Sequence, residues 1–310
     1  MFSRFTVLLL AFSLTVIAQT TPAEAAQPLK VLTSIKPLAL AIDEAFGDIV
    51  EVNALLPANV SPHSYALKPS DIRQLSDAEL FVWVGPGMEA FLPKMLKKAP
   101  PRQTLTLIEA FALHAPHLLL RYQAFGKEEE DHAGEHASHE EEDHADHTPG
   151  HIDLHLWLGR QQALEIARLV GESLKALRPD AATDIDRRVA AFENAMGTLP
   201  PAFALEGTRL VSHHNGFAYL MADLNLTINE VVVTQTDLTP GAQHFGELRD
   251  AFQDSPHCLI IEPQFGKSRI VDKLAALATH TVTLDSMGQH AESYTQLYQS
   301  WTDALKGCSS

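Results

Sequence analysis

Residues 29–56 read LKVLTSIKPLALAIDEAFGDIVEVNALL, and this stretch decides the fold of the chain. Its two ends, 29–35 and 49–56, are short and largely apolar, as buried strands are, and residues 37–45 between them predict a helix. A strand followed by a helix and a second strand predicts a parallel βαβ unit. We therefore expect a parallel α/β sheet in this part of the chain.

The same alternation continues through both halves of the chain. In the first half it predicts a helix that begins at Pro69 with Ser70 as its N-cap, and an amphipathic helix over 88–98. The remaining predicted strands are 80–84, 104–109, 209–213, 226–234, 257–261 and 281–284, and the remaining predicted helices are 217–224, 268–278, 291–306 and one that begins at Thr239-Pro240. Each half thus contains four strands, which predicts an α/β fold of two (β/α)4-type lobes with parallel sheets.

Two helices are predicted between these halves. Apolar residues repeat at helical spacing up to Leu177, and a second helix is expected from an N-cap at Thr183 to Pro200. A single long helix between two α/β halves is suited to joining two lobes. The predicted organisation is a signal peptide at 1–25, an N-terminal lobe at 26–178, a connecting helix at 179–200 and a C-terminal lobe at 201–310.

A second unusual stretch, residues 127–158, reads KEEEDHAGEHASHEEEDHADHTPGHIDLHLWL. Its first part has almost no apolar side chain to pack. We therefore expect the His-rich tract, residues 126–150, to be a surface loop that is disordered when no metal is bound. Imidazole and carboxylate are zinc ligands, and this density of histidine is typical of metal binding. The candidates for weak, secondary metal binding are His132, His136, His139, His144, His147 and His151. The alternative is a solvated acidic linker.

Composition and charge limit the classes of function that the chain could have. Hydrophobic residues make up 45% of the chain, which is enough for a core outside the His-rich tract. The formal net charge of −16 argues against nucleic acid as a partner, because binding to phosphates requires a basic surface.

The first 25 residues are typical of a secretory signal. Arg4 precedes the apolar run 7–17, and Ala23-Glu24-Ala25 is a cleavage site. The run is too short for a membrane span of roughly 20 residues, and no cysteine follows it to carry a lipid anchor. We therefore expect an exported, soluble protein. In an oxidising compartment the two cysteines, Cys258 and Cys308, are expected to form a disulfide, since the alternative of a two-thiolate metal site lacks C-x-x-C spacing.

Several possible metal ligands follow predicted strands, where parallel α/β sheets bind their ligands. His63 follows the second strand, and His214 ends the first strand of the second half. His155 lies in an apolar run, where it is either a metal ligand or a core histidine with hydrogen-bonded partners. Three imidazoles with a carboxylate or water would form a four-coordinate site suited to zinc. The other strand-end candidates are His213, Glu262 and Asp285, whereas the histidines interpreted as surface residues are His114, His117, His244, His280 and His290.

Four segments resemble signature segments of a known family. They are SPHSYALKPSD at 61–71, DLHLWL at 153–158, HNGFAY at 214–219 and TPGAQ at 239–243. The family is that of ZnuA, the periplasmic zinc-binding proteins of the bacterial high-affinity zinc ABC transporter, within the cluster A-I solute-binding proteins. The resemblance covers nearly all of the mature chain. It implies two α/β lobes joined by one long helix, with zinc held in the cleft between them.

Carried over residue by residue, the resemblance assigns the zinc (Zn2+) ligands to His63, His155 and His214. Manganese members typically have Glu at the third position, so a third histidine favours zinc. Asp285 matches an acidic position that is a ligand in manganese members and a neighbour or weak fourth ligand in zinc members. Pro62 stands where some zinc members have a Glu, so the fourth ligand is Asp285, water or a group of the His-rich tract.

The resulting hypothesis is a periplasmic binding protein without catalytic activity that delivers zinc to the permease of an ABC transporter, driven by its ATPase. We expect the protein to be monomeric. A manganese-binding member of the same family and a passive zinc buffer or adhesin are the alternatives, because both would show a similar ligand set. A secreted zinc hydrolase is a further alternative, but the chain contains no H-E-x-x-H motif.

Overall fold

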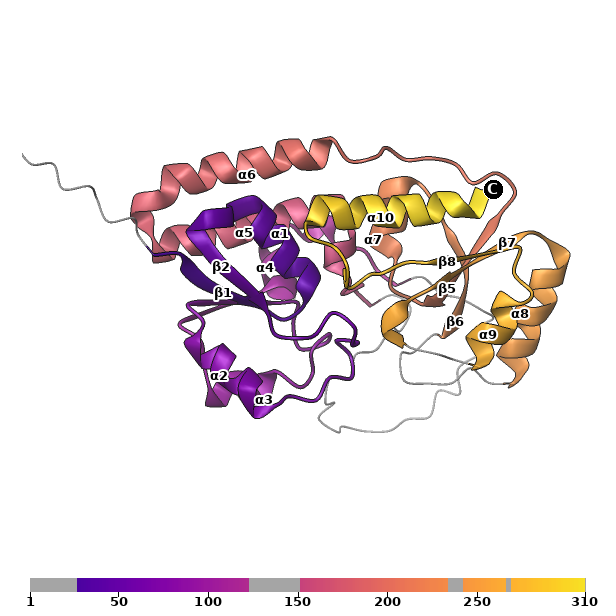
Figure 1. The fold of residues 1–310 in the computed structure, drawn as a ribbon, viewed down its shortest axis with the longest axis horizontal. Coiled ribbons are helices and arrows are strands. Elements are labelled where there is room, and N and C mark those ends of the chain that lie inside the picture. Colours follow the sequence, from indigo (N-terminus) through magenta and orange to yellow (C-terminus); the bar gives the residue numbers. More distant parts are fainter. Residues whose placement is uncertain (1–26, 123–150, 234–241, 266–268, 310) are drawn as a thin grey trace, which may run out of the picture.

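Two parallel four-stranded sheets form the framework of the computed structural model (Figure 1). The structure describes residues 27–122, 151–233, 242–265 and 269–309. The first sheet has the order β2-β1-β3-β4 and the second has the order β6-β5-β7-β8, so the strands of both sheets follow the same topology. The strands are β1 Leu29–Thr33, β2 Val50–Ala54, β3 Leu80–Trp83, β4 Gln103–Thr106, β5 Arg209–His214, β6 Ile228–Val233, β7 His257–Ile261 and β8 His280–Thr283. This confirms the predicted parallel α/β class.

Helices alternate with these strands and bury their apolar faces against the sheets. In the first helix Leu38, Ile42 and Phe46 recur every four residues, and all three are fully buried. The helices are α1 Lys36–Phe46, α2 Pro69–Asp77, α3 Pro93–Lys98, α4 Leu107–His114, α5 Arg160–Leu177, α6 Ala182–Gly197, α7 Ala218–Leu224, α8 Ala242–Asp254, α9 Arg269–Ala275 and α10 Tyr294–Lys306. None of the helices in the described ranges is long and apolar enough to cross a membrane.

The chain passes from the first sheet to the second through α5 and α6. Figure 1 shows α6 lying along α5 and α1, followed by an extended segment that leads to the second sheet. The first helix also packs against α10, where the Glu44 carboxylate accepts hydrogen bonds from the Thr295 amide at 2.8 Å and hydroxyl at 2.6 Å. Helices from opposite ends of the sequence therefore pack against each other.

Several predicted boundaries were wrong. The helix expected over 88–98 is formed only from Pro93, a residue that is favoured in the first turn of a helix. The strand expected over 104–109 ends at Thr106 and runs directly into α4, which the sequence analysis did not predict. His114 is therefore the last residue of a helix, although it is exposed as expected.

Both predicted N-caps were also wrong. The second helix begins at Pro69 after Lys68, whose amide donates to Asp71 Oδ2 at 2.8 Å, so Ser70 is inside the helix. Ala181 rather than Thr183 is the N-cap of α6. The start of the helix expected at Thr239-Pro240 lies outside the described residues.

The surface assignment of the histidines is confirmed in part. His117 and His290 are exposed, whereas His244 and His280 are half-buried. His244 Nε2 lies 2.9 Å from the Val231 carbonyl oxygen, and His280 is the first residue of β8.

The predicted disulfide between Cys258 and Cys308 is confirmed. Their Cα atoms lie 5.4 Å apart and their positions are 50 residues apart in the sequence. The bridge joins the start of β7 to the short 3-10 helix Gly307–Ser309 that follows α10.

Candidate metal centre

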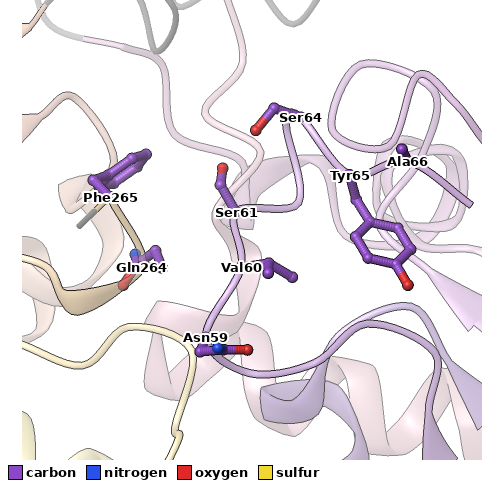
Figure 2. Close-up of a pocket in the computed structure, with 8 residues that line it drawn as sticks. All are labelled: Asn59, Val60, Ser61, Ser64, Tyr65, Ala66, Gln264 and Phe265. Carbon is purple, nitrogen blue, oxygen red and sulfur yellow. The ribbon is translucent and has the colours of Figure 1, made fainter.

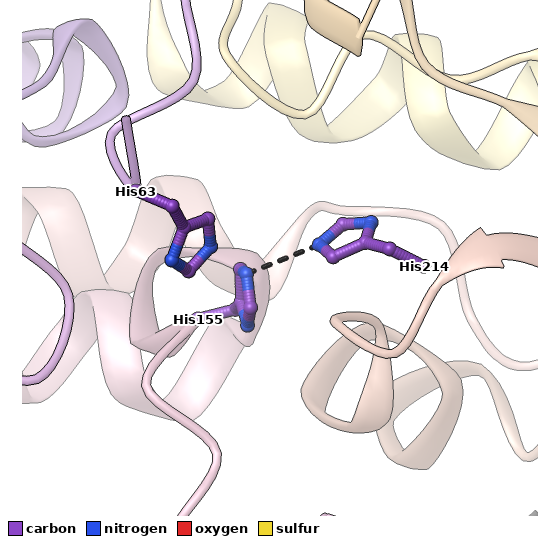
Figure 3. A group of neighbouring side chains, drawn as sticks. All are labelled: His63, His155 and His214. Carbon is purple, nitrogen blue, oxygen red and sulfur yellow. Dashed lines mark hydrogen bonds between the residues drawn. The ribbon is translucent and has the colours of Figure 1, made fainter. Parts of the chain in front are cut away.

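Three histidines from distant parts of the sequence meet in one cluster (Figure 3). His63 lies on the loop between β2 and α2, His155 directly precedes the 3-10 helix Leu156–Leu158, and His214 is the last residue of β5. Each offers a ring nitrogen, and these nitrogens all lie within 4.8 Å of one another. The structure thus brings together the three imidazoles that the sequence analysis singled out.

The spacing of the nitrogens suits a tetrahedral ion. His155 Nε2 and His214 Nε2 lie 3.2 Å apart. With Zn–N bonds of about 2.0–2.1 Å, two ligands of a tetrahedral zinc are separated by about 3.4 Å. The His63 ring completes a triangle, with its centroid 5.5 Å from that of His155 and 6.5 Å from that of His214.

A carboxylate holds the other ring nitrogen of two of these histidines. His155 Nδ1 lies 2.8 Å from Asp153 Oδ1, and His214 Nδ1 is hydrogen-bonded to Glu262 Oε2. A carboxylate can only accept, so each Nδ1 carries a proton, and in the neutral ring this leaves the lone pair on Nε2. This is the tautomer that metal ligation through Nε2 requires.

The charge of this cluster favours a dication. Asp153 and Glu262 are both buried, and no lysine or arginine is buried among the residues that the structure describes. Burial pushes the pKa of Glu262 up, but His214 and the hydrogen bond from Ser286 outweigh it and hold the pKa below its ordinary value. Two buried carboxylates beside neutral imidazoles leave a charge of about −2, which a divalent cation neutralises.

A cavity of about 320 Å³ lies beside the cluster (Figure 2). The loop that carries His63 forms one wall, and Gln264 and Phe265, which follow β7, form the other. The Phe265 ring also contacts His214, with centroids 4.8 Å apart. The segments that line the cavity therefore carry His63 and contact His214.

The other sequence candidates lie elsewhere. The Asp285 carboxylate accepts a hydrogen bond from the Gln289 amide at 2.6 Å and is not part of the histidine cluster, so its role as a fourth ligand stays a prediction. His213 is buried beside the site, where its ring contacts Phe265 at 5.0 Å and burial lowers its pKa. His151 is exposed. The five other candidate histidines of the tract lie outside the described residues.

Two functional roles were missed by the sequence analysis. Asp153 appeared only within the segment DLHLWL at 153–158, and Glu262 only as a strand-end residue. The D-x-H spacing was the available signal for Asp153, because its carboxylate reaches both the amide and the ring of His155, at 2.9 and 2.8 Å. Nothing in the local sequence links Glu262 to His214, since this contact depends on the pairing of β5 with β7.

Comparisons with known proteins identify the family of the chain. A family model described as "ZnuA: Zinc-uptake complex component A periplasmic" matches residues 31–308. The chain is 30% identical over 294 residues to the high-affinity zinc uptake system protein ZnuA of Haemophilus ducreyi, covering 90% of this chain and 92% of that protein. It is 29% identical over 268 residues to the ZnuA protein of Yersinia pestis, covering 83% of each chain.

Solved structures show the same fold. A crystal structure of ZnuA superposes with a TM-score of 0.69 at 22% identity, covering 90% of this chain and 98% of that one. A second, described as a 138-173 deletion mutant of ZnuA with zinc bound, superposes with a TM-score of 0.68 at 21% identity, covering 91% of this chain and 98% of that one.

Proposed function

Because the chain belongs to the ZnuA family of periplasmic zinc-uptake components, we propose that it captures one zinc ion and delivers it to a membrane permease. The family is one of transport proteins, so neither the hydrolase hypothesis nor a catalytic group is needed to account for the site. The proposed ligands are His63, His155 and His214.

The observation that carries this proposal is the pair of Nε2 atoms 3.2 Å apart, each on a ring whose Nδ1 is held by a buried carboxylate. All three donors are imidazole nitrogens. Such a donor set suits zinc better than manganese or magnesium, which prefer oxygen ligands. A third histidine in place of a carboxylate also argues against the manganese alternative.

We propose that the ion bridges two lobes. His63 follows the second strand of the first sheet and His214 ends a strand of the second sheet, so zinc would be held between residues 26–178 and residues 201–310. Residues 179–200 would connect the lobes. The fourth coordination position is open to water, or to Asp285 if its carboxylate leaves the Gln289 amide.

The rest of the transport cycle follows from this assignment. The loaded protein, as a monomer, would dock on the permease, and the ATPase of the same transporter would drive uptake. Residues 1–25 would direct export to the periplasm. The His-rich tract would hold further ions loosely and raise the local zinc concentration near the tight site.

Calorimetric titration of the metal-free protein tests the tight site. A His63→Ala/His155→Ala/His214→Ala variant should lose the tight zinc event and keep the weaker ones. The matched control is His114→Ala/His117→Ala/His290→Ala, which removes three exposed histidines and should titrate as the wild type does. Manganese should bind the wild type more weakly than zinc. A tight zinc event that survives in the cluster variant would contradict the proposal.

A further inference from the structure

Ser286 connects the surroundings of two proposed zinc ligands. This buried residue lies between β8 and α10. Its hydroxyl donates to Glu262 Oε1 at 2.7 Å, and its carbonyl oxygen accepts the indole N–H of Trp157 at 2.8 Å. One residue thus holds a partner on each side of the cluster, through its side chain and through its backbone.

The side-chain contact controls the orientation of His214. Glu262 Oε2 binds His214 Nδ1, while its other oxygen, Oε1, is fixed by Ser286 and by Gln264 Nε2 at 2.7 Å. Gln264 Nε2 also lies 2.6 Å from the Ser286 hydroxyl, so the three side chains form a closed triangle. A carboxylate held at both oxygens cannot rotate, and the imidazole it binds is held with it.

The backbone contact controls the segment that carries His155. Trp157 lies two residues further along the chain, and its ring centroid is 5.2 Å from that of His155. Its carbonyl oxygen accepts the Tyr294 hydroxyl at 2.6 Å, so the segment is anchored at Trp157 from two sides. A shift of the Ser286 backbone would therefore move the segment that presents His155.

We propose that Ser286 is a positioning residue for zinc, which aligns His214 through Glu262 and His155 through Trp157. This inference rests on the proposed function. The two Nε2 atoms lie 3.2 Å apart, close to the separation of about 3.4 Å between two ligands of a tetrahedral zinc. The Ser286 contacts act on both rings and keep them at the spacing that zinc requires.

The test is a Ser286→Ala variant compared with Ser173→Ala. Ser173 is also buried, but its hydroxyl donates to the Leu169 carbonyl oxygen within α5, at 3.1 Å. Competition titration with a chelator gives the zinc affinity, and the visible spectrum of the Co2+ complex reports the ligand geometry. Removal of an outer partner of a metal ligand typically lowers affinity by about 10–100-fold. We expect a loss of that size and an altered Co2+ spectrum for Ser286→Ala, and wild-type values for Ser173→Ala.

A second variant, Trp157→Phe, keeps an aromatic ring and removes the indole N–H that reaches Ser286. It tests the backbone contact, which Ser286→Ala leaves in place, and gives a readout of its own if Ser286→Ala does not fold. In the double variant, the loss of zinc affinity should differ from the sum of the two single losses, because both changes act on one network. Wild-type affinity and an unchanged Co2+ spectrum in either folded variant would overturn the positioning role. A wild-type protein without a tight zinc event would instead overturn the proposed function itself.

Discussion

At Gly216 the histidine cluster leaves no room for a side chain. A Cβ atom at this position would lie 2.4 Å from His214 Nε2 and 3.0 Å from His155 Cε1. Gly216→Ala would therefore place a methyl group where the metal and its ligands meet. Removing a residue that holds a metal ligand typically lowers affinity by about 10–100-fold, and we expect a larger loss of zinc affinity here. Calorimetric titration measures this loss.

The matched control is Gly246→Ala. Gly246 lies inside α8, and a Cβ atom there would meet nothing within 4 Å. Alanine is favoured over glycine inside a helix by about 1 kcal/mol, so this variant should be slightly more stable and bind zinc normally. Equal zinc affinity in Gly216→Ala and the wild type would show that the ion is not bound between His155 and His214.

Glu89 makes the stability of the protein depend on pH. Burial raises its pKa from 4.5 to about 7, although the amides of Gly85 and Val84 donate hydrogen bonds to it at 2.9 and 3.3 Å. The folded state thus keeps a proton that the unfolded state releases. The stabilisation is fully present below pH 4.5 and is lost as the pH rises through about 7.

A Glu89→Gln variant cannot ionise and should lack this dependence. A shift of this size corresponds to about 3 kcal/mol, so the decline in the free energy of unfolding from pH 5 to pH 8 should be smaller in the variant by up to that amount. Urea unfolding at both pH values measures it. The charge-matched control is Glu109→Gln, which changes an exposed glutamate. An unaltered pH profile in Glu89→Gln would show that Glu89 does not carry the effect.

At the scale of elements, the disulfide ties the end of the chain to β7. Closing a loop of 50 residues stabilises the folded state by about 4 kcal/mol in the chain-entropy model. Cys258 lies near the start of β7, while Glu262 follows the end of the same strand. A Cys258→Ala/Cys308→Ala variant should therefore lose about 2–5 kcal/mol of stability and keep its zinc affinity. Denaturant unfolding and zinc titration check both parts, and a large loss of affinity would contradict this separation.

The elements could be predicted where one periodicity was clear. The run HCLII gave β7 with both boundaries correct, because a short apolar run between polar residues has few other interpretations. The helix α4 was missed because Thr104-Leu105-Thr106 favours a strand. The residues that follow are mostly apolar, and such a run is compatible with either a strand or a helix. Local residue types did not mark where one element became the other.

The site could be predicted only as far as strand ends reveal it. The carboxyl ends of parallel strands gave His63 and His214, and an unusual histidine in an apolar run gave His155. The contacts of Asp153, Glu262 and Ser286 depend on side-chain directions and on strand order, which a single sequence does not show. The chemistry of the ligands was therefore predictable, whereas the groups that orient them were not.

At the scale of the whole molecule, the residues on either side of the His-rich tract pair with each other beside His155. An antiparallel bridge pairs Arg121 with Ile152, and the Tyr122 amide donates to the His151 carbonyl oxygen at 2.9 Å. Asp153, which holds His155, donates its own amide to the Leu120 carbonyl oxygen at 2.9 Å. Whatever the tract binds is thus attached to the segment that presents a proposed zinc ligand.

This pairing makes a clean deletion possible. Removing residues 127–150 leaves four residues between Tyr122 and His151, which is long enough to close an antiparallel pair. The variant should therefore keep its melting temperature and its tight zinc event, and lose the weaker events. If the tract raises the local zinc concentration, cells carrying the deletion should grow more slowly only when a chelator makes zinc scarce. Normal growth under chelation would remove the accessory role, and loss of the tight event would place a ligand of the transported ion within the tract.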